Sequence, residues 1–80
     1  MLTELASSNK VVGVKQSRKA VRDGRAVKLF LAQDADPAIT QPLIAECTQR
    51  GIPVDCGSNL TQIGHACGIT VGAAVAALLK

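Results

Sequence analysis

Hydrophobic and polar residues follow two different spacings along this chain. Short apolar runs, typical of strands, predict four strands, which cover residues 11–14, 26–32, 52–56 and 71–79. Stretches with the 3.6-residue spacing of helices predict four helices, which cover residues 2–9, 15–23, 42–50 and 60–66. Helices and strands therefore alternate along the chain.

This alternation predicts a sheet between two layers of helices. The expected fold class is α/β, a three-layer α/β/α sandwich with a four-stranded mixed sheet in the order α-β-α-β-α-β-α-β. Because 80 residues are too few for two domains, residues 1–80 are expected to form a single domain. The run 71–79 is too short to cross a bilayer and lacks polar alternation, which suits a strand covered on both faces.

Glycine and proline mark the ends of several predicted elements. Gly13 ends the first strand, and Gly24 stands where the C-terminal cap of the second helix is expected. Pro42 predicts the start of the third helix, with Thr40 as its cap, because proline suits the first helical turn and disrupts the interior. Pro53 places the third strand at a sheet edge or lies outside the hydrogen-bonded ladder.

Short polar residues are expected to form the turns. Residues 57–59 are predicted to be a loop, and Asn59 with Gln62 three positions later matches a capping box for the fourth helix. Asp34 and Asp36 are interpreted as turn and capping residues in preference to a pair of catalytic carboxylates.

Positive charge is concentrated in residues 10–28. This segment holds seven Lys and Arg residues and one acidic residue, whereas the whole chain has a formal charge of +3. Four of these cations share one face of the second predicted helix, namely Lys15, Arg18, Lys19 and Arg22. Like charges at this spacing repel one another, so the pattern favours a polyanionic partner, although a solvated amphipathic helix remains an alternative.

The start of this helix has the chemistry of a base-reading site. Gly13 allows close approach of the backbone, and free N–H groups of a first helical turn attract phosphate or base acceptors. Lys15 can donate to guanine O6 and N7, and Gln16 can bond base edges. The chain has no exposed aromatic platform for stacking single strands, because Phe30 is its only aromatic residue.

Five motifs, in order along nearly the whole chain, resemble signatures of the ribosomal L-seven-Ae and L-thirty-e family. The resemblance is to its short bacterial branch of proteins that bind kink-turns, which are sharply bent RNA duplexes. The motifs are Gly13–Ala20, Asp34–Pro37, Gly51–Val54, Ile63–Ile69 and Val71–Ala74.

The resemblance implies an α/β/α sandwich whose glycine-led helix enters the widened groove of a kink-turn, where sheared G·A pairs expose guanine edges. It assigns base readout to Lys15 and Gln16 and brings Arg18, Lys19 and Arg22 near phosphates, with Gly13 and Val14 at the start of the helix. The implied partners are a kink-turn in ribosomal RNA or a structured mRNA element, and the ribosome, and the implied binding form is a monomer.

The resemblance also implies a second RNA element in the loop before the last helix. Its residues are Gly57, Ser58, Asn59 and Leu60, continuing to Thr61. Here the chain departs from the archaeal pattern, with Gly57 in place of a branched apolar residue and with Leu60 and Thr61 where lysines are common. The loop is expected to offer backbone N–H groups and few side chains, which predicts weaker and more salt-sensitive binding.

No metal, cofactor, small-molecule substrate or catalytic activity is expected. Cys47, Cys56 and Cys67 are irregularly spaced, and His65 diverges from Cys67 around a helix, so neither a disulfide framework nor a zinc site is predicted. The first nine residues carry Glu4 and do not resemble a secretion signal, so a cytoplasmic location is expected. The alternative function is a ribosome-assembly or protein-interaction module with only nonspecific RNA contacts.

Overall fold

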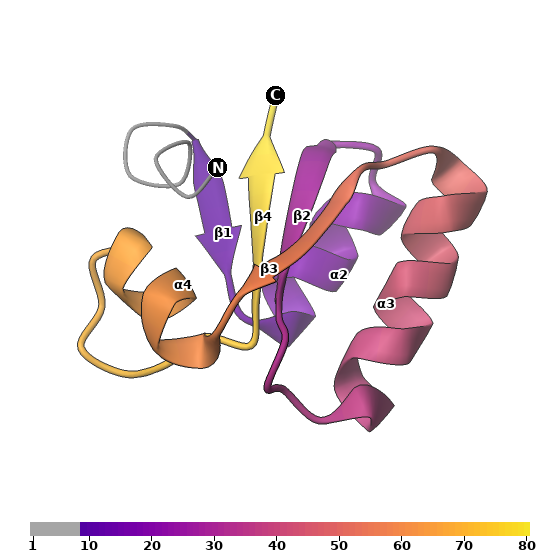
Figure 1. The fold of residues 1–80 in the computed structure, drawn as a ribbon. Coiled ribbons are helices and arrows are strands. Elements are labelled where there is room, and N and C mark those ends of the chain that lie inside the picture. The colour runs from indigo at the N-terminus through magenta and orange to yellow at the C-terminus, as the bar shows by residue number, and fades with distance from the viewer. Residues whose placement is uncertain (1–8) are drawn as a thin grey trace.

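The computed structural model describes residues 9–80 and shows four strands and three helices in that part of the chain (Figure 1). In chain order they are β1 (Lys10–Val12), α2 (Val14–Arg22), β2 (Ala26–Ala32), α3 (Pro37–Arg50), β3 (Val54–Ser58), α4 (Leu60–Ala66) and β4 (Val75–Leu79). The helix predicted over residues 2–9 lies outside the described residues.

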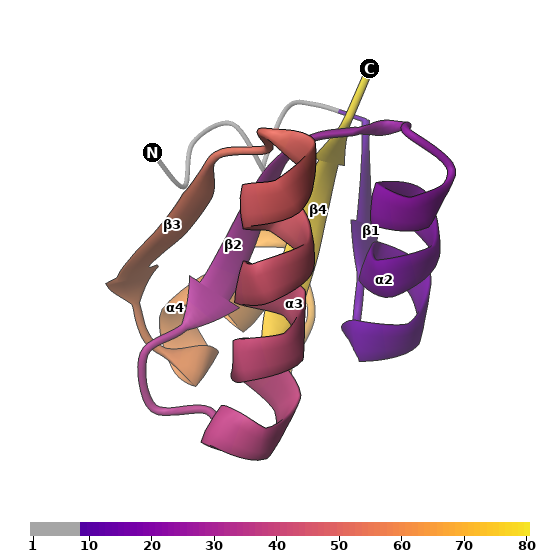
Figure 2. The ribbon, with the colours of Figure 1, turned by 90° about the vertical axis from the view of Figure 1, so that its right-hand side faces the viewer.

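The strands form one mixed sheet between two layers of helices. Their order is β1-β4-β2-β3, with β4 antiparallel to β1 and β2, and with β3 parallel to β2. The helices α2 and α3 cover one face of the sheet, and α4 covers the other (Figures 1 and 2). This arrangement confirms the predicted α/β/α sandwich with a four-stranded mixed sheet.

Alternating residues of the two central strands divide the core. In β2, Leu29 and Leu31 face α2 and α3, whereas Phe30 faces α4. The strand β4 is buried on both faces, as its uniform apolar sequence predicts. Val27 is apolar but 40% exposed, because the pairing with β4 shifts register between Ala26 and Lys28.

The prediction that the third helix starts at Pro42 is wrong. Helix α3 starts at Pro37, and Asp36 caps it by accepting a hydrogen bond from the Ala38 N–H at 2.9 Å. Thr40 is therefore a buried helical residue and not a cap. Pro42 lies inside the helix on its exposed side, where water can solvate the carbonyl left without an N–H donor.

Two predicted strands also begin too early in the chain. The strand β3 starts at Val54, after Pro53, and lies at the sheet edge as predicted. It extends to Ser58, so Gly57 and Ser58 belong to the strand and not to a loop. The strand β4 starts at Val75, so residues 71–74 form a loop after α4.

The end of the first strand needs a similar correction. Val14 was placed at the end of a strand over residues 11–14, but β1 ends at Val12 and Val14 is the first residue of α2. The predicted positions of both glycines are confirmed, since Gly13 precedes α2 and Gly24, with φ 72°, follows its end.

Candidate nucleic-acid interface

A glycine in an unusual conformation sets the start of α2. Gly13 has φ 102° and ψ 156°, a region that is essentially restricted to glycine. Its N–H donates to the Val75 carbonyl at 2.8 Å, which fixes this turn against the start of β4. The helix therefore begins at a defined edge of the sheet.

The first turn of α2 keeps donors available for a ligand. The Gly13 carbonyl accepts the first helical hydrogen bond, from the Ser17 N–H at 3.0 Å. The N–H groups of Val14, Lys15 and Gln16 therefore have no partner within the helix, and Gly13 has no side chain to cap them. Lys15 and Gln16 are exposed, so the helix end predicted to read bases is accessible and not covered by the core.

The outer face of α2 is a basic surface along its whole length. Its four exposed cations are Lys15, Arg18, Lys19 and Arg22. Together with Gln16 and Asp23 they line a surface hollow. Within residues 9–80, only Arg22 among these four forms an ion pair, with Glu46 at 3.8 Å. The opposite face is fully buried through Ser17, Ala20 and Val21. Most of this positive charge is thus uncompensated.

Three of the five backbone donors expected in residues 57–61 are bonded within the protein, those of Gly57, Asn59 and Leu60. The predicted capping box is present, with Asn59 Oδ1 accepting from the Gln62 N–H at 2.8 Å and Gln62 Oε1 accepting from the Asn59 N–H at 3.0 Å. Asp34 Oδ1 accepts from the Leu60 N–H at 2.8 Å, across 26 positions of sequence. Gly57 also donates within the protein, to Asp55 Oδ1 at 2.8 Å.

The structure nevertheless brings the two predicted RNA elements to the same end of the sheet. The Ala73 N–H donates to the Leu60 carbonyl at the start of α4, and two residues later Val75 accepts from Gly13 at the start of α2. Residues 72–75 therefore bridge the segment Gly57–Leu60 and the first turn of α2.

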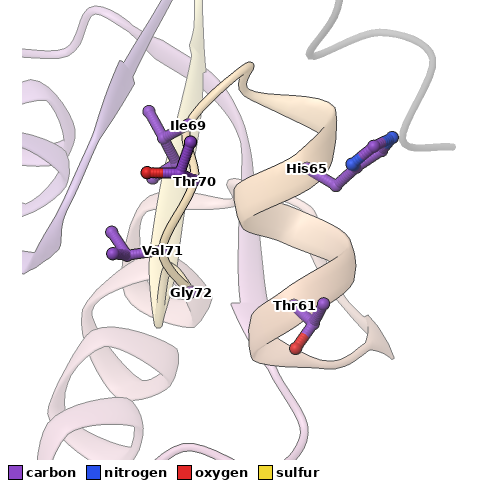
Figure 3. Close-up of a pocket in the computed structure, with 6 residues that line it drawn as sticks. All are labelled: Thr61, His65, Ile69, Thr70, Val71 and Gly72. Carbon is purple, nitrogen blue, oxygen red and sulfur yellow. The ribbon is translucent and has the colours of Figure 1, made fainter.

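A third segment of this surface, the loop over residues 67–74, was not predicted. Ile69 and Val71 expose 37% and 69% of their surface, although both are large and apolar. The Val71 carbonyl lies against Gly64 of α4, where there is no room for a side chain. With Thr61 and His65 of α4, this loop lines a surface hollow (Figure 3). The available sequence signal was Gly72, which interrupts the run assigned to a strand.

The thiols and the histidine of residues 9–80 do not assemble a metal centre. No group of three His, Cys, Asp or Glu residues in this part of the chain could hold a metal ion. Burial, followed by the nearby Glu46 carboxylate, raises the pKa of Cys47, and burial raises the pKa of half-buried Cys67. Cys56 is exposed on β3, and all three thiols are free. None of the helices in the described residues is long and apolar enough to span a membrane.

Comparison with known proteins adds family relationships to this geometry. The sequence profile of the "Ribosomal protein L7Ae/L30e/S12e/Gadd45 family" matches residues 2–80. An RNA-binding protein of Geobacillus sp. (strain WCH70) is 34% identical over 76 residues, which cover 95% of this chain and 93% of that protein. The RNA-binding protein YbxF of Geobacillus stearothermophilus is 36% identical over 70 residues, or 88% of this chain and 85% of YbxF.

Solved structures are similar over almost the whole chain. The 15.5 kD RNA binding protein of Giardia lamblia superposes with a TM-score of 0.92 at 27% identity, covering 99% of this chain and 70% of that one. A protein with unknown function from Bacillus halodurans C has a TM-score of 0.89 at 25% identity, covering 99% of this chain and 83% of the other.

Proposed function

Because this chain belongs to the ribosomal protein L7Ae/L30e/S12e/Gadd45 family, we propose that it is a non-enzymatic RNA-binding protein that recognises kink-turn RNA. The observation that carries the proposal is the accessible first turn of α2, where Lys15 and Gln16 are exposed beside N–H groups without helical partners. The RNA-binding relatives in Geobacillus and Giardia support the same chemistry.

The shape of RNA explains why a kinked duplex suits this helix end. The major groove of regular A-form RNA is deep and narrow, so side chains cannot read bases there. A sharp bend that widens the groove admits the start of α2, where Lys15 can donate to guanine O6 and N7 and Gln16 can bond a base edge. Arg18, Lys19 and Arg22 then neutralise phosphates along the outer face.

The loop over residues 67–74 adds an apolar contact to this surface. Ile69 and Val71 are exposed in the loop that packs against α4, and unstacked bases in bent RNA present apolar faces. We assign these two side chains to the cover of a base that has left the stack. The segment Gly57–Leu60 would contact the RNA at the same end of the sheet through the shape of its backbone.

The cellular partner would be a kink-turn in ribosomal RNA or in a structured mRNA element, bound by a cytoplasmic monomer. The test compares binding of the full chain to a kink-turn duplex and to a duplex of equal length whose G·A pairs are replaced by Watson–Crick pairs. We expect clearly tighter binding to the kink-turn. Equal affinities would contradict the proposal and would favour a module with only nonspecific RNA contacts.

A further inference from the structure

A second group of cations lies at the opposite end of α2 from Gly13. Arg25 follows α2, Arg50 is the last residue of α3, and Lys80 follows β4. The Lys80 N–H donates to the Arg25 carbonyl at 3.0 Å, which brings two residues far apart in sequence together. Arg50 and Lys80 line one surface hollow, and all three elements end on the same side of the sheet (Figure 1).

Local ion pairing leaves much of this charge uncompensated. Arg25 lies 3.7 Å from the Asp23 carboxylate, and both side chains are about half exposed, so the pair contributes little. Within residues 9–80, Arg50 and Lys80 form no ion pair. The partial negative charge at a helix C-terminus accounts for Arg50 at the end of α3, but Lys80 follows a strand and has no such explanation.

The basic face of α2 connects this group to the candidate base-reading end. Nine residues of α-helix span about 14 Å at about 1.5 Å per residue. With the axial spacing of roughly 3.4 Å per strand in duplex DNA as a guide, an RNA helix that follows α2 reaches the far end after about four phosphates. The same RNA can therefore contact both ends of α2.

We propose that Arg25, Arg50 and Lys80 form a second RNA contact, here called the distal basic surface, which holds phosphates of a helix flanking the kinked site. This inference rests on the proposed function, since it needs α2 to lie against RNA. It adds a contact that reads no sequence and acts only when the flanking helix is long enough.

The test uses the double variant Arg50→Gln/Lys80→Gln and two kink-turn RNAs. In one RNA the helices end about three base pairs beyond the kink, and in the other they continue for about twelve. Each lost phosphate contact lowers the slope of log affinity against log salt by about 0.9, or about eightfold in affinity at 0.1 M salt. For the double variant and the long RNA, we expect the slope of log affinity against log salt to be about 1.8 smaller than for the wild type, and binding to be up to about 60-fold weaker. Binding of the short RNA should not change.

A matched control removes two cations from the other side of the sheet. Lys10 and Lys28 are both register partners of Leu78, on the face that α4 covers. The variant Lys10→Gln/Lys28→Gln has the same net charge as the test variant and should bind long and short RNAs with an unchanged preference.

Four outcomes separate the ways in which the two proposals can fail. An unchanged affinity of the test variant for the long RNA overturns the distal basic surface. The same conclusion follows if the test variant loses as much affinity for the short RNA as for the long one, or if the control variant loses as much affinity as the test variant. Either result would be a general effect of reduced charge. Wild-type protein that does not distinguish the kink-turn from its Watson–Crick counterpart contradicts the proposed function instead, whatever the flanking length does.

Discussion

Replacing Gly13 with alanine should destabilise the fold through backbone strain alone. Apart from its two chain neighbours, an added Cβ at this position would meet no atom of residues 9–80 within 4 Å, so steric crowding by residues more distant along the described chain is excluded. The conformation itself, φ 102° and ψ 156°, is essentially restricted to glycine and costs other residues about 1–3 kcal/mol. A loss of that size is a large part of a total stability of about 4–12 kcal/mol for a chain of this length.

The effect can be measured by thermal and urea unfolding of the full chain. For a domain of this size, about 1 kcal/mol shifts Tm by roughly 4–8 °C, so the Gly13→Ala variant should melt roughly 4–24 °C lower. RNA affinity at a temperature where the variant is still folded should also fall. If the turn relaxes to relieve the strain, Lys15 and Gln16 move away from their positions beside β4.

Gly51 provides the matched control for this experiment. It caps α3 with φ 70° and ψ 26°, an ordinary left-handed conformation, and an added Cβ there also meets open space. Asparagine tolerates that conformation, so Gly51→Asn should be nearly neutral, whereas Gly13→Asn should be as damaging as Gly13→Ala. The reasoning would be refuted by a Gly13→Ala variant that unfolds at the wild-type temperature and binds RNA as before.

Three further predictions address the surface, the core and the thiols. Lys15→Ala should cost about 1–3 kcal/mol of binding free energy and reduce kink-turn selectivity, whereas Arg22→Ala should weaken all RNAs alike, as titrations against both duplexes would show. Ser17→Ala should leave urea stability unchanged or raise it by up to about 1 kcal/mol, because the buried Ser17 hydroxyl has no hydrogen-bond partner among residues 9–80; a clear loss would contradict this. Cys56 should react first with a thiol reagent near neutral pH, while Cys47, buried and with a raised pKa, should react only on unfolding, which mass spectrometry of the labelled chain can follow.

The parts of the fold that were predicted correctly depend on local patterns. The bounds of β2 follow from its apolar run, and the capping box at Asn59 follows from two residues three positions apart. The exposed basic face of α2 follows from four cations at helical spacing. The predicted start of α3 was wrong because Pro37 and Pro42 are both compatible with a first helical turn. The cap formed by Asp36 places the start at Pro37.

The start of β4 depends on tertiary contacts that local sequence does not contain. Residues 71–74 are apolar enough for a strand, but the close approach of Val71 to Gly64, and of Gly72 to Leu60, holds them against α4. The exposure of Val71 is a consequence of this packing. In the candidate site, α2 was therefore predictable from its own spacing, whereas the loop over residues 67–74 and the meeting of Arg50 with Lys80 were not.

The internal hydrogen bonds at the start of α4 change how binding energy should be distributed over this surface. Three N–H groups there, those of Asn59, Leu60 and Gln62, donate to side-chain oxygens of the protein, and one of these oxygens belongs to the Asp34 carboxylate. Displacing such an acceptor with an RNA phosphate would exchange one hydrogen bond for another and would add repulsion from Asp34. The donors of α2 have no such competitors within the helix, so we expect α2 and its cations to carry most of the affinity. Binding that depends on cations is strongly screened, so the salt dependence should fall when charges on α2 are removed and should change little when residues at the start of α4 are replaced.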